Sequence, residues 1–318
     1  ISGLMVVNRS GEPGDDDSDI RIRGINTLND ATALVVIDGI ANRDGGLGRI
    51  NPNDIESITV LKDASAAIFG AQAANGVILV TTKRGKVGPP EVGLALNFGM
   101  NQPTRLPDVL NAPEYATILN ELDEYAGRDH RFTDEDIRKF GDGSDPFGHP
   151  NTNWYDETIK PWSPQGNANL TLSGGNENTT YYFSGGGTYE DGYFKNSAVG
   201  YNQYNFRSNL DAKVRKNIKL RFDISGRQES RIYTQTRGGS TFRYLIGMKP
   251  TEPAFWPKRS TDKERLPGPD FESGQNPAVT STDVTGYNHD NNYIFQSNVG
   301  MDLTDLFTVK GLSFVGNV

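Results

Sequence analysis

Two adjoining segments in which apolar and polar side chains alternate constrain the fold of this chain more than any other feature. The first has apolar side chains at even positions and polar ones at odd positions: Tyr204, Phe206, Leu210, Ala212 and Val214 against Asn205, Arg207, Asn209, Asp211 and Lys213. The second, past a turn near Asn217, sets Ile218, Leu220, Phe222 and Ile224 against Lys219, Arg221, Asp223 and Ser225. Because successive side chains of a strand point to opposite faces, the pair predicts a β-hairpin with one apolar and one charged face.

The apolar face of this hairpin needs either a protein core, as in a β-sandwich, or lipid, as in a membrane β-barrel. Each alternating run covers about the 9 to 11 residues that cross a bilayer as a tilted strand, which favours the barrel. A barrel would also place Arg207, Lys213 and Arg221 in a polar lumen, where charge costs little. Aromatic residues near the expected strand ends suit the membrane interfaces, or an ordinary sheet; they are Tyr181, Phe183, Tyr189, Tyr201 and Tyr204.

Composition removes several classes of function. The net charge of −8, with scattered Lys and Arg, disfavours a nucleic-acid partner, which needs concentrated positive charge. The absence of Cys excludes disulfides, thiolate metal sites and thiol nucleophiles. No run of about 18 apolar residues occurs, which excludes a transmembrane helix but not a barrel.

The N-terminal part of the chain has a different pattern. Short apolar runs at 20–23, 34–37, 55–61 and 77–82, each bounded by Gly, Asp or Asn, predict strands. The Ala-rich stretch 62–70 predicts one short helix that ends at Gly70. Together they predict a small α/β unit, with a positive φ or a close backbone approach expected at Gly24, Gly39, Gly70 and Gly76.

Several motifs of this unit carry a family resemblance. They are Ile22-Arg23-Gly24, residues 34–39 (LVVIDG) and residues 55–70 (IESITVLKDASAAIFG), and their order and spacing resemble the plug domain of TonB-dependent outer-membrane transporters. Residues 74–86 (ANGVILVTTKRGK) are similar to the closing strand of the plug in the SusC/RagA branch. The resemblance implies an α/β plug at 1–88, followed over 89–318 by the first strands and loops of an antiparallel membrane β-barrel that is incomplete in this chain.

The expected barrel cannot close on this chain alone. Plugged transporter barrels have about 22 strands, whereas the sequence offers about eight candidates at the usual spacing. We therefore expect a fragment whose missing strands are C-terminal. The TonB box, the N-terminal part of the plug and any signal peptide are expected to lie outside it.

The matching motifs supply the candidate residues of the plug. The plug motif comprises Arg23, Gly24, Asp38, Gly39, Glu56, Lys62, Asp63, Gly70, Asn75 and Gly76. Its charged members could form a charged binding site, but ion pairs between plug and barrel are favoured. Cargo contacts are assigned to two apical loops, at Asn26, Asn29 and Asp30 and at Asn42, Arg43 and Asp44, although polar loop tips are also common without any ligand.

The resemblance implies import of an oligosaccharide or a peptide across the bacterial outer membrane. It implies a SusD-like surface lipoprotein, TonB and outer-membrane lipid as partners, and no nucleic acid. An enzyme is not expected, because the sequence has no phosphate-binding loop, no His pair at metal spacing and no nucleophile elbow. A secreted β-rich glycan-binding or glycan-degrading protein is the alternative, while a passive porin would lack the plug.

No cofactor is expected, and Ca²⁺ remains an alternative without a specific motif. The acidic candidates are Asp15, Asp16, Asp17 and Asp19 in one group and Asp142 and Asp145 in the other, and solvated loops explain them more simply.

The rest of the chain predicts strands separated by helical insertions and one long loop. Val92, Leu94, Leu96 and Phe98 predict a strand, and residues 165–175 predict another. Asn111 and the pair Thr133 and Asp136 predict the starts of two helices. Residues 231–287 predict a long extracellular loop with a helical turn at 241–248, and strands are expected again at 293–303 and 312–318.

Overall fold

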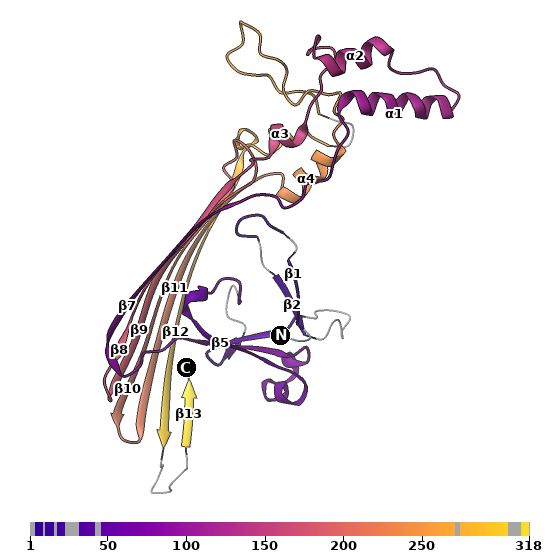
Figure 1. Cartoon of the computed structure of the whole chain (residues 1–318). Helices are drawn as coiled ribbons and strands as arrows, with labels where there is room; N and C mark the ends of the chain where they lie inside the picture. The colour runs from indigo at the N-terminus through magenta and orange to yellow at the C-terminus, as the bar shows by residue number, and fades with distance from the viewer. Residues whose placement is uncertain are drawn as a thin grey trace.

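The structure is a computed structural model that describes residues 4–8, 10–15, 18–22, 32–41, 46–270, 274–304 and 313–317. Its main feature is a seven-stranded sheet that forms a tall, curved wall (Figure 1). Two small sheets lie beside the lower half of this wall in the view of Figure 1, and the α-helices gather beyond its upper end. None of the helices in the described part of the chain is long and apolar enough to cross a lipid bilayer.

The wall is antiparallel throughout, and each strand pairs with the next one along the chain. Its strands are β7 (Gly88–Asn101), β8 (Ser163–Gly175), β9 (Thr179–Asp191), β10 (Gly200–Arg215), β11 (Ile218–Thr234), β12 (Tyr287–Thr304) and β13 (Ser313–Asn317). Every strand except β13 is longer than the roughly 9 to 11 residues that a strand needs to cross a bilayer. The meander of long strands confirms the predicted antiparallel barrel, which is incomplete in this chain.

The two faces of the wall differ as the alternation predicts. On β10 the side chain of Phe206 is 48% exposed on the outer face, whereas the next residue, Arg207, is only 8% exposed and faces the small sheets. Phe222 and Ile224 of β11 are also exposed on the outer face. The ring of Phe206 lies over its cross-strand partner Gly226, where an added Cβ would come within 2.2 Å of the ring. An aromatic ring that covers a glycine in this way fixes the register of the two strands.

Tyr201 does not belong to an outer aromatic girdle, and this prediction was wrong. Its side chain is 4% exposed, and its hydroxyl lies 2.7 Å from Gln203 Oε1 on the inner face of β10. The other tyrosine predicted on this strand, Tyr204, is exposed on the outer face. Tyr201 lies three residues from the outward-facing Tyr204 and six residues from the inward-facing Arg207. Because successive side chains of a strand alternate between its faces, Tyr201 must share the inner face with Arg207.

The small sheets contain the four predicted strands and two short ones that were not predicted, at 4–8 and 40–41. One sheet pairs β1 (Leu4–Asn8) with β2 (Ser18–Ile22), and the other has the order β4-β3-β6-β5. Its strands are β3 (Leu34–Ile37), β4 (Ile40–Ala41), β5 (Ile55–Leu61) and β6 (Val77–Thr82). The predicted helix is a 3₁₀ helix, Asp63–Phe69. Val36, Val77, Ile78 and Val80 are at most 2% exposed, so the central strands β3 and β6 form the core of this unit.

Glycine is required where β6 begins. Gly76 has φ +89°, and a Cβ there would approach Ile22 Cδ1 to 2.7 Å. Its small size thus lets β2 pack against the start of β6. Gly39 and Gly70 also have the expected positive φ values, +85° and +74°.

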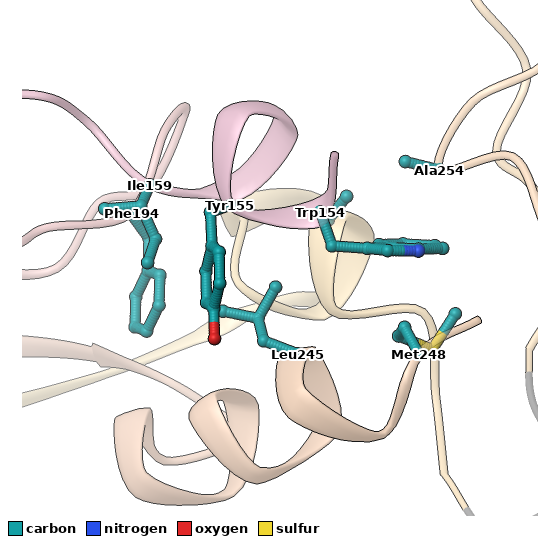
Figure 2. Close-up of a cluster of buried hydrophobic side chains, with 8 residues drawn as sticks. Trp154, Tyr155, Ile159, Phe194, Leu245, Met248 and Ala254 are labelled. Atoms are coloured by element: carbon teal, nitrogen blue, oxygen red, sulfur yellow. The ribbon is translucent and has the colours of Figure 1, made fainter. Parts of the chain in front are cut away.

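The helices lie in the connections at one end of the wall. They are α1 (Ala112–Tyr125), α2 (Asp134–Asp142), α3 (Trp154–Thr158), α4 (Gly238–Gly247) and α5 (Pro277–Thr280). Capping boxes begin α1 at Asn111 and α2 at Thr133, as predicted. Trp154 and Tyr155 of α3 pack with Leu245 of α4 and the adjacent Met248 in a buried core, the largest outside the sheets (Figure 2). The long loop begins only after Thr234, because β11 extends beyond the predicted position 231.

Candidate functional site

The small sheets contact the wall mainly through charged and polar side chains. These contacts form three groups, which we name after their arginines the Arg207, Arg84 and Arg231 clusters. Each joins residues more than 80 positions apart in the sequence, so each depends on the tertiary fold. The clusters are the best candidate site in the described part of the chain, because they join the small sheets to the wall through buried charge.

The Arg207 cluster lies at the centre of the interface. Arg207 of β10 has Nη1 3.7 Å from Asp38 Oδ2 and Nε 3.6 Å from Asp54 Oδ2. The Tyr182 hydroxyl of β9 donates a hydrogen bond of 3.0 Å to Asp54 Oδ1. All three charged side chains are at least nine-tenths buried. One wall arginine therefore faces two carboxylates of the four-stranded sheet in a region with little water to screen them.

Local structure positions both carboxylates. Asp38 and Gly39 form the two-residue turn between β3 and β4 with φ values of +50° and +85°, and Asp-Gly is the preferred pair for such a turn. The Asp38 carboxylate accepts hydrogen bonds from the backbone N–H and the hydroxyl of Thr82, at 2.9 and 2.8 Å. Asp54 ends the 3₁₀ helix Pro52–Asp54, which is capped by Asn51. The turn and the short helix thus hold both acidic side chains in position to face Arg207.

The Arg84 cluster fastens the segment that leads from β6 into the wall. Arg84 Nη1 donates to Asp211 Oδ1 of β10 and Nη2 donates to Asp223 Oδ2 of β11, both at 2.8 Å. Lys219 Nζ lies 3.0 Å from the second oxygen of Asp211. A single guanidinium thus bridges two neighbouring wall strands, which suits its planar, multi-donor geometry.

Gly85 lets this segment lie directly on the wall. A Cβ added at Gly85 would lie 2.3 Å from the backbone nitrogen of Tyr181 in β9 and 2.4 Å from its carbonyl oxygen. Next to it, the Asn209 side chain of β10 donates to the carbonyl oxygen of Lys83 at 2.7 Å. The backbone of residues 83–85 is therefore in direct contact with the wall, and a larger residue at 85 would separate them.

The Arg231 cluster joins the loop between β1 and β2 to the wall. Arg231 Nη2 of β11 lies 3.5 Å from Glu12 Oε1 and 3.3 Å from Asp15 Oδ2. The other Glu12 oxygen accepts a hydrogen bond of 3.3 Å from the backbone N–H of Gly238, in the first turn of α4. Glu12 thus contacts both the wall and a helix outside it.

Arg49 extends this cluster toward the four-stranded sheet. Its Nη2 donates to the carbonyl oxygen of Gly14 at 2.8 Å, and its Nε lies 3.6 Å from Glu229 Oε1. The guanidinium carbon of Arg49 lies 5.2 Å from the centre of the Tyr201 ring, a cation–π distance. The inward orientation of Tyr201 therefore serves the contact between the small sheets and the wall.

Polar contacts of this kind fix the position of the small sheets on the wall without the strong binding of a large apolar interface. A buried ion pair recovers roughly the free energy that its desolvation costs, so it adds little net affinity, whereas removing one partner is strongly unfavourable. Uncharged side chains also cross the interface, as in the 2.8 Å hydrogen bond from Asn51 Nδ2 to Asn169 Oδ1. The two units are thus held in register by groups that water can solvate once they separate.

The structure describes only part of the predicted plug motif. Asp38 lies in the Arg207 cluster, and Gly39 forms its turn. Glu56 Oε1 lies 3.9 Å from Lys86 Nζ, and both side chains are exposed. Lys62 and Asn75 are half-buried, and each has a polar or electrostatic partner. Asp63 begins the 3₁₀ helix that precedes Gly70.

The remaining candidates fall outside the described residues. They are Arg23 and Gly24 of the motif, and all six proposed cargo contacts: Asn26, Asn29, Asp30, Asn42, Arg43 and Asp44.

Sequence reasoning placed Arg207 on the inner face but did not name Asp54, Arg84, Glu12 or Glu229 as interface residues. Arg84 lies directly after the last strand of the small unit, but nothing in the sequence pairs it with Asp211 or Asp223. Asp54 had no local signal, because its wall partners Arg207 and Tyr182 lie more than 100 positions away in the sequence.

The acidic groups considered for Ca²⁺ lie in other contacts where they are described. Asp15 lies beside Arg231, and Asp19 lies 3.6 Å from Arg21. The backbone N–H of Ser144 donates to Asp142, and that of Gly148 donates to Asp145. No group of three or more His, Cys, Asp or Glu side chains with metal-binding geometry occurs among the described residues.

His149 lies between two carboxylates in the α2 connection. Its Nε2 is 2.8 Å from Asp136 Oδ1 and its Nδ1 is 2.9 Å from Asp145 Oδ2. These hydrogen bonds raise the pKa of His149 above 6.5. Hydrogen bonds from Thr133 and from His149 lower the pKa of Asp136 to about 2. The cluster therefore favours a protonated His149 that joins α2 to the segment that follows it.

Comparison with known proteins agrees with this architecture. Residues 1–77 match the family profile of the TonB-dependent Receptor Plug Domain. The chain is 35% identical over 260 residues to the TonB-dependent receptor P26 of Formosa agariphila, which covers 80% of this chain and 24% of that protein. It is 32% identical over 271 residues to the TonB-dependent receptor SusC of Bacteroides thetaiotaomicron, with the same 80% and 24% coverage.

The fold comparison covers the entire chain. The RagAB peptide importer in its closed-closed state superposes with a TM-score of 0.73 at 20% identity, over 100% of this chain and 37% of that one. The chain thus spans about a quarter of the length of the curated relatives that it matches. The matched region contains the small sheets, the polar interface and the wall. The chain is therefore similar to the TonB-dependent receptors of the SusC/RagA type, with the small sheets as a plug domain and the wall as part of a β-barrel.

Proposed function

We propose that the protein to which this chain belongs actively imports an oligosaccharide or a peptide across the bacterial outer membrane. The polar, ion-paired contact between plug and wall carries this proposal. A plug inside a barrel blocks the lumen, so transport requires the plug to move against its contacts with the wall. Groups such as Arg84, Arg207 and Arg231 can exchange these contacts for water, whereas a large apolar interface would resist separation.

The work in this proposal comes from TonB, which pulls on the plug from the periplasmic side, and the chain itself turns over no substrate. In this arrangement residues 1–88 act as the plug and residues 89–318 as part of the barrel; β7 begins at Gly88, next to this boundary. The loops that carry Asn26 and Asn42 are the proposed apical cargo contacts, and no cofactor is needed.

A surface lipoprotein of the SusD type is the proposed extracellular partner. The support is an apolar stripe on α1, where Ile118, Leu122 and Tyr125 are exposed at helical spacing. Exposed apolar side chains grouped on one helix face are typical of an interface. Co-purification of the lipoprotein with the transporter should weaken with Leu122→Glu and persist with Glu124→Gln, since Glu124 is exposed on the same helix outside this stripe.

Uptake measurements in the native bacterium test the import proposal. Uptake of the cognate oligosaccharide or peptide should disappear when TonB is deleted or when a protonophore collapses the proton gradient. Cargo binding at the cell surface should survive both treatments, because binding does not require the plug to move. Uptake that continues unchanged under either treatment would contradict active transport and leave a passive pore.

A further inference from the structure

A cavity of about 590 Å³ lies between the β1–β2 loop of the plug and the helices beyond the wall. The loop points up toward α4 in Figure 1, and the hydrogen bond between Glu12 and Gly238 joins them. Residues 10–13 of the plug form one side of the cavity, and the first turns of α4 form another. The volume falls within the range of about 300 to 1,000 Å³ that is usual for ligand pockets. We call this cavity the roof pocket.

The lining of the roof pocket is predominantly apolar. Ile159, Phe194, Val199 and Phe242 contribute apolar side chains, and Tyr193 adds a half-buried ring. The polar side chains of Gln102, Thr104 and Arg105 are exposed, so they belong to its rim. A ligand group inside the pocket would therefore meet mainly carbon atoms.

The one carboxylate in the lining is paired with an arginine. The Glu12 side chain is 10% exposed; one oxygen accepts a hydrogen bond from the Gly238 N–H, and the other has no hydrogen-bond partner among the described residues but lies 3.5 Å from Arg231 Nη2. Arg231 thus balances its charge, and the pocket does not select for a cation. A sugar would bring hydroxyl groups that the apolar lining leaves without hydrogen bonds, which is costly. An apolar side chain meets no such cost and gains from burial.

We propose that the roof pocket binds an apolar or aromatic side chain of a peptide cargo. This inference rests on the proposed import function and narrows its cargo class. Because one side of the pocket belongs to the plug, a peptide bound there contacts the plug and the outer helices together. Displacement of the β1–β2 loop removes that side and opens the pocket, so the same movement that clears the lumen releases the side chain of the peptide.

Two glycines allow the pocket to be filled without disturbing its lining. No described atom lies within 4 Å of a Cβ built at Gly239 in α4 or at Gly11 in the plug loop, and neither residue has a positive φ. Both residues line the pocket, Gly11 from the plug loop and Gly239 from α4. Gly239→Leu and Gly11→Leu should therefore place a side chain in the cavity. Ser240→Leu is the matched control, because Ser240 is exposed on the same helix and does not line the pocket.

Fluorescence binding to the purified full-length transporter tests the proposal. The probes are a labelled pentapeptide with a central Phe, its counterpart with a central Ser, and labelled maltoheptaose. The Phe peptide should bind about tenfold more tightly than the Ser peptide. Gly239→Leu and Gly11→Leu should each abolish this difference, and Ser240→Leu should retain it. The heat-modifiable mobility of the barrel shows which variants have folded, and the two filling variants serve as independent tests.

Several results would overturn the proposal. They are equal binding of the two peptides or none at all, a Phe preference that survives in either filled variant once it has folded, and maltoheptaose binding that the filled variants abolish. In each case TonB-dependent uptake of another cargo could still stand, because uptake is measured separately. A Phe preference that behaves as expected alongside uptake independent of TonB would contradict only the import proposal.

Discussion

Arg207 is the residue whose loss should most disturb the seating of the plug. It faces Asp38 and Asp54, whose side chains are only 4% and 3% exposed, so its removal leaves two buried carboxylates without their cation. Breaking a buried ion pair from one side costs about 3 to 5 kcal/mol. Arg207→Met should lower the free energy of local opening at β6 by an amount of this order, measured as hydrogen exchange of the Thr82 amide, which donates to Asp38.

A combined variant provides the control for this prediction. Arg207→Met together with Asp38→Asn and Asp54→Asn removes the buried negative charges, and should recover part of the lost protection. Protection of Thr82 that does not change in Arg207→Met would show that the cluster does not seat the plug.

His149 should make the α2 segment sensitive to pH. Its pKa is raised in the folded state, so its stabilising contribution is complete below pH 6.5, the ordinary value, and is lost as the pH rises through the raised pKa. The pKa of Asp136 is lowered from 3.8 to about 2, so its contribution is complete above its ordinary value and is lost as the pH falls toward 2. The segment should therefore resist proteolysis best between about pH 4 and 6.5.

NMR titration of the His149 ring checks this prediction directly. The pKa should lie above 6.5, and Asp136→Asn or Asp145→Asn should each lower it, because each variant removes one carboxylate partner. A pKa at or below 6.5 in the unmodified protein would contradict the arrangement.

At the scale of elements, the segment between β6 and β7 depends on a glycine. Gly85→Ala would drive a Cβ to 2.3 Å from the Tyr181 backbone, and steric overlap of this kind costs about 1 to 3 kcal/mol. The variant should reduce the yield of folded, heat-modifiable protein in the outer membrane. Gly88→Ala is the control, because no described atom lies within 4 Å of a Cβ at that position. Equal yields from the two variants would refute the close approach at Gly85.

The outer face of the β10–β11 hairpin should tolerate apolar substitutions only. Leu220 lies on this face with Phe222, so Leu220→Arg should destabilise the inserted barrel by about 2 to 4 kcal/mol if it lies near the bilayer midplane. Urea titration of protein refolded into lipid vesicles measures the effect, with Leu220→Met as the volume-conserving control. Stability unchanged by the arginine would mean that this face does not meet lipid.

Periodicity predicts these elements well because burial repeats along a strand. The alternation from Tyr204 to Ser225 predicted the hairpin and its faces, and the capping residues Asn111 and Thr133 predicted two helix starts. The placement of Tyr201 was wrong because residue type was weighed above register. The 3₁₀ geometry of Asp63–Phe69 was not predicted either, since an Ala-rich run is compatible with both kinds of helix.

The interface was less predictable than the elements because its partners are far apart in sequence. Arg84 and Asp223 are separated by 139 positions, and nothing in either local pattern indicates the other. Asp38 was found from the plug motif, but its partner Arg207 was identified only as an inward-facing charge. A family resemblance supplies the topology that brings such residues together, and the contacts themselves require the structure.

In the whole molecule, the proposed import requires the plug to separate from the wall for cargo to pass. Asn51 of the plug and Asn169 of β8 are joined side chain to side chain at 2.8 Å, and the chain has no native Cys. Asn51→Cys with Asn169→Cys, bridged by a short bifunctional thiol reagent in the full-length transporter, would therefore fix the plug to the wall. Bridging should abolish TonB-dependent uptake while surface binding persists, and each single-Cys variant treated alike should import normally. Undiminished uptake by fully bridged protein would contradict this requirement.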